Sequence, residues 1–299
     1  MHELLNIAPE VNDALREHRP VVALESTVIA HGLPRPQNLQ TAHRLQEVVR
    51  ETGATPATIA IIDGKPSVGL SDDQVNVLAN STGIRKISTR DIAIAAAQGA
   101  NGATTVASTI WIAHRAGIKV FATGGIGGVH RGSIPDISAD LPELARTPIV
   151  VVCSGAKIVL DLPATREWLE THAVTVVGYQ CDELPAFYSR RSGLPIDARV
   201  ESAEDVAGIY SAQRDLGINS ALLVVVPVPA KFEVPAEELQ IVLTTALEDA
   251  EWKGIAGPAL TPFLLGQMAE RSGGSTLRAN IALLENNARV AAEIARAVG

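Results

Sequence analysis

The chain has 299 residues, of which 46% are hydrophobic and 19% are charged, so it can fill a large core and is too apolar for a disordered protein. Its 25 basic and 33 acidic residues give a formal net charge of −8. Because no basic stripe offsets this charge, we expect no nucleic-acid partner. A phosphorylated small molecule held in a local basic pocket remains compatible with it.

Cysteine content and hydropathy indicate where the protein works. Cys153 and Cys181 form neither a disulfide framework nor a metal-binding pattern, which is typical of a reducing compartment. Residues 1–10 carry acidic side chains and no apolar core of signal-peptide length, and the longest apolar runs, such as 221–226, are too short to span a bilayer. We therefore expect a cytoplasmic protein without a membrane partner.

Short β-branched runs alternate with longer helical patterns, which predicts an α/β fold with helices layered on both faces of a largely parallel sheet. No linker or low-complexity tract divides residues 1–299, so we expect one domain. Ser202, Asp205 and Gly217 carry the start and stop signals of one of the helices. The expected strands are 21–24, 58–62, 119–122, 149–153, 174–177 and 221–226. The expected helices are 38–51, 91–98, 105–116, 165–171, 202–215, 236–252, 261–270 and 275–297.

Ligands of parallel sheets bind beyond the carboxyl ends of the strands, so the residues that follow each strand are candidates. Glu25 follows the first strand, where burial beside apolar neighbours would raise its pKa and suit it to general acid catalysis. A Glu that only caps or pairs with a neighbour fits the sequence equally well. His31 lies nearby and fits a structural histidine better than a ligand.

Cations cluster in the segment 84–91, where Arg85, Lys86 and Arg90 lie within a few residues ahead of an expected helix. Such a cluster suits phosphate, although a solvated surface patch would have the same composition. The hydroxyl-rich segment 101–109 follows and can offer N–H and hydroxyl donors at a helix start. Together the two segments predict an anion site that includes Lys86.

A glycine-rich stretch, 121–132, follows the third expected strand and leads to the carboxylates Asp136 and Asp140. Its glycines let backbone N–H groups approach a ligand, His130 and Arg131 can hold an anion, and the carboxylates can hold a metal or move a proton. The stretch fails the dinucleotide-binding fingerprint because His130 stands where the third glycine is required. We therefore expect a site for a charged small molecule.

Lys157 follows the fourth expected strand through the small residues 154–156. Desolvation there would lower its pKa and make the neutral amine a nucleophile, although a snorkelling surface lysine is the simpler interpretation for this residue by itself. The functional interpretation rests on convergence, since six candidates lie at or just beyond strand ends: Glu25, Lys86, His130, Asp136, Asp140 and Lys157.

Long motifs in the chain resemble the pseudouridine-5′-phosphate glycosidase family. The resemblance covers nearly the full length and is carried by residues 23–32, 101–109, 120–132, 136–141, 152–157, 178–180, 184–187, 261–265 and 280–287. It implies reversible cleavage of pseudouridine 5′-phosphate to uracil and ribose 5-phosphate by a homotrimer with a divalent metal, usually Mn²⁺. The segment 133–135 is shorter than the family pattern, which puts the local pocket shape in question.

The resemblance also implies roles for individual residues: Lys157 as the nucleophile, Glu25 as the proton donor and Asp136 as the metal ligand. Substrate-contacting positions are matched by Lys86, Val106, His130, Ser138, Ala139, Asp140 and Asn280. A lysine is useful because the sugar is joined to a uracil carbon, so that a Schiff-base intermediate can assist C–C cleavage, with Asp140 as the candidate for protonating that carbon. Two alternatives stay open: another Schiff-base lyase or aldolase acting on sugar phosphates, and a non-catalytic sugar-phosphate-binding protein.

Overall fold

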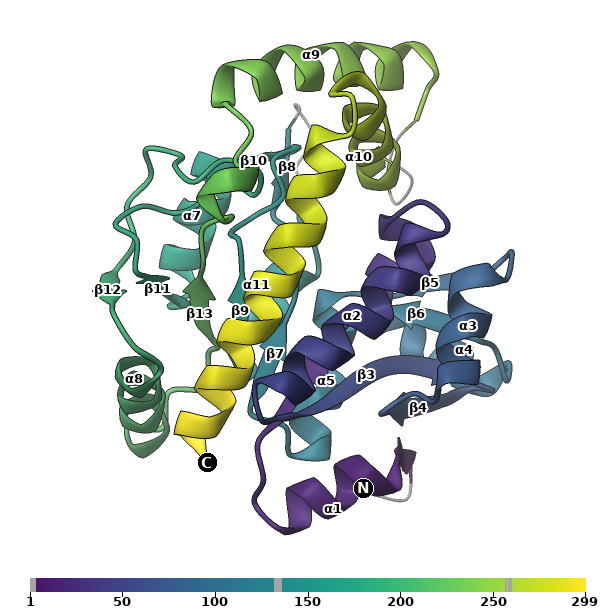
Figure 1. Ribbon diagram of the computed structural model, residues 1–299, viewed down its shortest axis with the longest axis vertical. Coiled ribbons are helices and arrows are strands. Elements are labelled where there is room, and N and C mark those ends of the chain that lie inside the picture. Colours follow the sequence, from purple (N-terminus) through teal and green to yellow (C-terminus); the bar gives the residue numbers. More distant parts are fainter. Residues whose placement is uncertain (1–3, 132–135, 256, 258–259) are drawn as a thin grey trace.

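The computed structural model describes residues 4–131, 136–255, 257 and 260–299, and its centre is one large sheet (Figure 1). Eleven strands of the described residues form this sheet. The main path runs β1 (Asn6–Ile7), β4 (Lys65–Val68), β3 (Thr55–Ile62), β2 (Val21–Leu24), β7 (Val120–Ala122), β9 (Val150–Cys153), β13 (Leu222–Val225), β11 (Thr175–Tyr179) and β12 (Ala198–Val200). A branch of β6 (Gly102–Thr104) and β5 (Arg85–Ile87) joins at β3.

The central strands are parallel, as predicted. Every pair from β3 through β2, β7, β9, β13 and β11 to β12 is parallel, whereas β4 and β6 pair with β3 in antiparallel orientation. All residues of β2, β7, β9 and β13 are buried. Continuous burial explains why these strands read as unbroken apolar runs, since helices cover both sheet faces.

Helices form a layer on each side of the central strands. In Figure 1, α2 and α11 lie in front of the sheet and α5 lies behind it, and α11 packs against α2, α8, β7 and β9. The helices are α1 (Pro9–Arg16), α2 (Gln37–Glu51), α3 (Asp72–Asn80), α4 (Ile92–Ala97), α5 (Val106–Ala116), α6 (Asp140–Leu144), α7 (Leu162–Thr171), α8 (Ala203–Asp215), α9 (Ala236–Trp252), α10 (Leu260–Arg271) and α11 (Ser275–Val298). The predicted α/β fold with helices on both faces is confirmed.

Side-chain caps fix several helix ends. Ser202 and Asp205 form the predicted capping box of α8, and Gly217 has the left-handed φ of 72° just beyond its end. The helix α7 begins at Leu162, ahead of the predicted start, because Asp161 accepts a hydrogen bond from the Ala164 N–H at 2.9 Å. A cap therefore extended this helix beyond the range that its apolar pattern indicated.

Short elements were missed by the sequence analysis. Two of the three clustered cations, Arg85 and Lys86, lie in β5, and Lys86 pairs with Ala103 of β6. A single-turn 3₁₀ helix, Thr89–Asp91, then precedes α4, and a π-helix, Val28–Gly32, follows β2. A two-stranded ribbon, β8 (Val129–His130) with β10 (Leu160–Asp161), was also missed. Three-residue strands carry too little local pattern to be seen without their partners.

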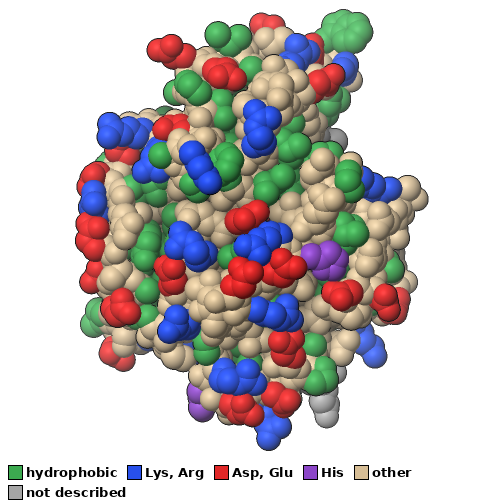
Figure 2. Space-filling model, viewed as in Figure 1, with side chains coloured by type: hydrophobic (Ala, Val, Ile, Leu, Met, Phe, Trp, Pro, Cys, Tyr) green, Lys and Arg blue, Asp and Glu red, His purple; other side chains and the backbone are tan. Residues whose placement is uncertain are grey.

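The outer surface over α2 and α11 carries charges of both signs. Figure 2 shows basic and acidic side chains intermingled on this face. Several of them pair, since Arg44 contacts Glu51 at 3.0 Å and Glu285 of α11 at 3.7 Å, and Arg50 contacts Glu10 at 2.9 Å. Within the described ranges, no helix has the length and apolarity that a membrane crossing requires.

Candidate active site

A cavity of about 260 Å³ opens at the carboxyl edge of the sheet, where β2, β7 and β9 end. Parallel strands point their carboxyl ends to this edge, so segments far apart in sequence supply its walls. Nine of the candidates line it: Glu25, Lys86, Val106, His130, Asp136, Ser138, Ala139, Asp140 and Lys157. The structure therefore brings together in one cavity almost every residue singled out from the sequence.

A smaller cavity of about 60 Å³ adjoins the first one and has a different lining. It shares Glu25, Lys86 and Lys157 with the larger cavity, and its own wall includes Asn280 of α11 with the apolar side chains of Phe187 and Leu265. The shared residues stand at the junction of a polar compartment and a more apolar one. Asn280 thus faces the smaller compartment, where it meets the three shared candidates, and it does not line the larger one.

Glu25 is buried just beyond the end of β2. Its side chain is 8% exposed, and the Thr123 hydroxyl, which follows β7, donates a hydrogen bond to Glu25 Oε1. Burial raises the pKa of this carboxyl, and the nearby charge of Lys157 and the Thr123 hydrogen bond oppose that rise without cancelling it. A carboxyl with a raised pKa can keep its proton near neutral pH and donate it.

Lys157 is presented by a turn that is locked to the glycine-rich stretch. The Lys157 N–H donates to the Ile126 carbonyl at 3.1 Å, and the Ile126 N–H donates to the Gly155 carbonyl at 3.0 Å. Gly155 has φ 79°, and a Cβ there would come within 2.2 Å of the Pro185 carbonyl oxygen. Only glycine fits this position, so the turn that carries Lys157 depends on it.

Lys86 projects from β5 into both cavities. Desolvation and the charge of Lys157 lower the pKa of the Lys86 ammonium, while Asp140 and Glu25 act in the opposite direction. Ser88 and Arg90 line the larger cavity next to it. This wall therefore gathers basic and hydroxyl groups, as an anion such as phosphate requires.

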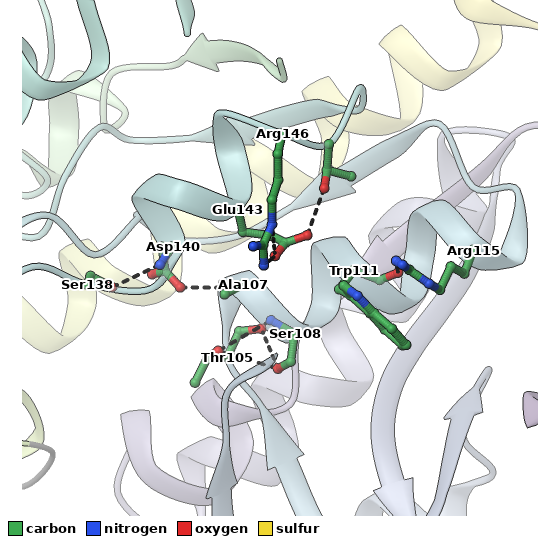
Figure 3. Close-up of polar contacts among 10 residues, drawn as sticks. Thr105, Ala107, Ser108, Trp111, Arg115, Ser138, Asp140, Glu143 and Arg146 are labelled. Carbon is green, nitrogen blue, oxygen red and sulfur yellow. Dashed lines mark hydrogen bonds and ion pairs between the residues drawn. The ribbon is translucent and has the colours of Figure 1, made fainter. Parts of the chain in front are cut away.

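Asp140 connects the start of α5 to the glycine-rich stretch. Its Oδ1 accepts a hydrogen bond from the Ala107 N–H at 2.9 Å, as Figure 3 shows, and its Oδ2 accepts one from the Gly127 N–H at 2.8 Å. The side chain is 5% exposed. Both carboxyl oxygens of Asp140 therefore act as hydrogen-bond acceptors, and these bonds fix the orientation of the side chain.

Asp136 and His130 lie together at the mouth of the larger cavity. The His130 N–H donates to the Asp136 carbonyl at 2.8 Å, and the exposed Asp136 side chain lines the cavity. In the described part of the chain no group of three or more His, Cys, Asp or Glu side chains is placed to hold a metal ion. A single carboxylate nevertheless suits Mg²⁺ or Mn²⁺ bound mainly through water and substrate oxygens. The segment 133–135 lies outside the described residues.

Several lining residues were missed from the sequence. Thr123, the hydrogen-bond partner of Glu25, directly follows β7, so the strand-end rule applied to this strand would have found it. Thr261 and Phe187 come from segments that carry no strand-end signal, and only the fold brings them to the cavities. His31 lines the smaller cavity, and burial lowers the pKa of its imidazole.

Comparison with known proteins identifies the family. The sequence profile described as indigoidine synthase A like protein matches residues 10–297. A pseudouridine-5′-phosphate glycosidase of Caldanaerobacter subterraneus subsp. tengcongensis is 50% identical, with 99% of this chain and 97% of the relative covered. The chain belongs to the indigoidine synthase A-like family, among its pseudouridine-5′-phosphate glycosidases. The family recognised from the sequence motifs is thereby confirmed.

Further similar proteins agree with this placement. The pseudouridine-5′-phosphate glycosidase of Escherichia coli K12 is 50% identical, with 98% of this chain and 95% of the relative covered. The prealnumycin C-glycosynthase AlnA, whose crystal structure contains ribulose 5-phosphate, superposes with a TM-score of 0.91 at 41% identity over 99% of this chain and 97% of AlnA. An indigoidine synthase A-like protein of Thermotoga maritima has a TM-score of 0.90 at 40% identity over 99% of this chain and 96% of that protein.

Proposed function

We propose that this enzyme cleaves the C-glycosidic bond of pseudouridine 5′-phosphate reversibly, giving uracil and ribose 5-phosphate. The main support is that a lysine and a buried carboxyl with a raised pKa, Lys157 and Glu25, line one cavity in a chain 50% identical to relatives named for this activity. The structural relative AlnA holds a five-carbon sugar phosphate, which is the class of ligand that the proposal requires.

The first half of the proposed reaction opens the sugar ring. The neutral amine of Lys157 adds to the anomeric carbon, and the bond from that carbon to the ring oxygen breaks as Glu25 donates its proton to the oxygen. The raised pKa of Glu25 supports this role because the carboxyl must be protonated at the start. The product is an open-chain sugar with the lysine nitrogen and uracil on the same carbon.

The second half breaks the carbon–carbon bond. The lysine nitrogen gives up a proton, the uracil carbon receives one, and the nitrogen lone pair forms an iminium as uracil leaves. Asp140 remains our candidate for moving this proton; because its oxygens accept backbone N–H groups, it would first take the proton as a carboxylate and then donate it. Water then hydrolyses the iminium and releases ribose 5-phosphate.

The two compartments suggest how the substrate lies. We propose that the phosphate and ribose occupy the larger cavity, where Lys86 supplies charge and the segment Ser138 to Asp140 supplies polar groups, with Val106 and His130 at its walls. The uracil then faces the smaller cavity, where Asn280 can hydrogen-bond its edge. A divalent metal held by Asp136, with Mn²⁺ as the expected ion, would neutralise negative charge near the phosphate.

Uracil release from pseudouridine 5′-phosphate tests this proposal against the two alternatives. The wild-type protein should release uracil, and borohydride reduction with ribose 5-phosphate should leave a covalent adduct on Lys157 that mass spectrometry detects. Lys157→Ala should fold normally by circular dichroism, form no adduct and lose turnover, because the nucleophile is gone.

The alternatives predict different results. A Schiff-base aldolase would give the adduct without uracil release, and a binding protein would bind ribose 5-phosphate tightly without forming any adduct. Either pattern in the wild-type protein would overturn the proposed reaction, as would a Lys157→Ala variant that retains full turnover.

A further inference from the structure

Asn287, in the middle of α11, is fully buried and hydrogen-bonds to two separate turns beneath the site. Its Nδ2 donates to the Thr123 carbonyl at 2.9 Å and to Ser154 Oγ at 3.1 Å, with a longer contact to the Gly124 carbonyl at 3.5 Å. The Ser154 hydroxyl also lies 3.3 Å from Asn287 Oδ1. Asn287 and Ser154 are both 0% exposed, so water does not replace these bonds.

The two turns carry the chemical groups of the proposed reaction. Thr123 donates through its hydroxyl to Glu25, and Ser154 begins the turn that leads to Lys157. The turns also contact each other, since the Ser154 N–H donates to the Gly124 carbonyl at 2.9 Å. The Asn287 amide therefore hydrogen-bonds both to the residue that contacts Glu25 and to the turn that carries Lys157.

We infer that Asn287 is a positioning residue that sets the Thr123 hydroxyl against Glu25 and aligns the turn of Lys157. The inference rests on the proposed function, because it assigns those two residues their roles. An amide suits the position because it offers two donors and one acceptor to two turns at once. A leucine of similar size would leave the Thr123 carbonyl and the Ser154 hydroxyl buried without partners.

The test compares Asn287→Ala with wild type in uracil release from pseudouridine 5′-phosphate. We expect kcat to fall roughly 10-fold to 100-fold, as when a reacting group is misplaced by about 1 Å, with KM within about twofold because Asn287 does not line either cavity. Loss of the Thr123 hydrogen bond raises the pKa of Glu25 further, so the alkaline limb of the pH profile should move to higher pH. Thr123→Val removes the same hydrogen bond, so it should also move the alkaline limb of the pH profile to higher pH.

The matched control is Val290→Ala, which removes buried methyl groups from the same helix and leaves the hydrogen bonds of Asn287 to the two turns in place. It should lower the melting temperature and leave kcat and the pH profile unchanged. If Asn287→Ala folds but behaves like this control, the positioning role is wrong. If Asn287→Ala fails to fold, Ser154→Ala decides, since it should lower kcat at constant KM, and an unchanged kcat would overturn the inference.

Failure of the inference is distinguishable from failure of the proposed function. A wild-type protein that releases no uracil contradicts the function, and the crystal structure of Asn287→Ala then decides the positioning separately. The expected result is a Thr123 hydroxyl displaced from Glu25. An unchanged Thr123–Glu25 contact in that structure would overturn the positioning role whatever the reaction proves to be.

Discussion

Two carboxyl groups in the site have opposite surroundings. Glu25 is buried with one hydroxyl donor, and its pKa is raised, whereas Asp140 accepts two backbone N–H groups. The surroundings of Glu25 suit it to proton donation. We therefore propose that Glu25 makes the first proton donation and that Asp140 moves the later proton.

The raised pKa of Glu25 predicts the pH dependence of the activity. Since the proposed reaction requires the protonated carboxyl, kcat/KM should stay constant below the raised pKa and fall as pH increases through it. Glu25→Gln removes the proton donor and should lower kcat by about 10²-fold to 10⁴-fold. A pH series of initial rates for both proteins checks this, and wild-type rates in the Glu25→Gln variant would contradict the assignment.

Asp136 supplies the test of the metal. Removal of divalent ions with a chelator should reduce activity, and Mn²⁺ should restore it. Asp136→Asn keeps the size of the side chain and removes its charge, so it should weaken Mn²⁺ binding because hard cations prefer carboxylate oxygens. Titration calorimetry with Mn²⁺ and the sugar phosphate measures this directly, and an unchanged Mn²⁺ affinity would count against Asp136 as the ligand.

At the scale of elements, the glycine-rich stretch allows the backbone to pass close to neighbouring side chains. A Cβ at Gly127 would lie 2.2 Å from Ser138 Oγ and 2.7 Å from Asp140 Oδ2. The close approach is what allows the Gly127 N–H to reach Asp140. The stretch therefore keeps α6, the start of α5 and the cavity floor in register.

Gly127→Ala should thus damage the site more than the fold. We expect about 1–3 kcal/mol of destabilisation from overpacking and a large loss of activity as Asp140 is displaced. Gly208→Ala is the control, because a Cβ at this position of α8 meets nothing within 4 Å. It should raise stability by about 0.5–1 kcal/mol and leave activity unchanged. Chemical denaturation measures the stability and uracil release measures the activity. Equal activities in the two variants would contradict the requirement for glycine at position 127.

At the scale of the whole molecule, α11 connects the helices that cover the sheet with the central strands and the site. It packs against α2 on one side and α8 on the other, contacts β2, β7 and β9, and carries both Asn280 and Asn287. A single helix thus takes part in the core, in the wall of the smaller cavity and in the support of the reactive turns. Substitutions of its polar buried residues should therefore affect stability and catalysis together.

The family resemblance also leads us to propose a homotrimer in the cytoplasm. Sedimentation equilibrium should give three times the chain mass of 31.4 kDa at micromolar concentration. Exposed apolar side chains such as Ile241 and Trp252 on α9, which are 70% and 84% exposed, are surfaces that association could cover. A monomer at all concentrations would exclude the trimer and leave the proposed chemistry untouched.

Much of this protein follows from local sequence. The buried strands read as short β-branched runs, helix ends carry their own caps, and candidates at strand ends could be named because parallel strands share one carboxyl edge. What the local pattern lacks is pairing over long distances. The strand β5 exists because it pairs with β6, and its three residues carry no periodicity that would reveal it.

The tertiary structure alone decided which groups act on one another. Thr123 meets Glu25 across 98 residues of chain, Asp140 meets the Ala107 N–H across 33, and Asn287 meets the Thr123 carbonyl across 164. The sequence by itself determined the fold class and the family, and it named ten candidate site residues, all of which line one of the two cavities. The environment that raises the pKa of Glu25, orients Asp140 and aligns Lys157 arises only when the folded chain excludes water and brings these distant segments into contact.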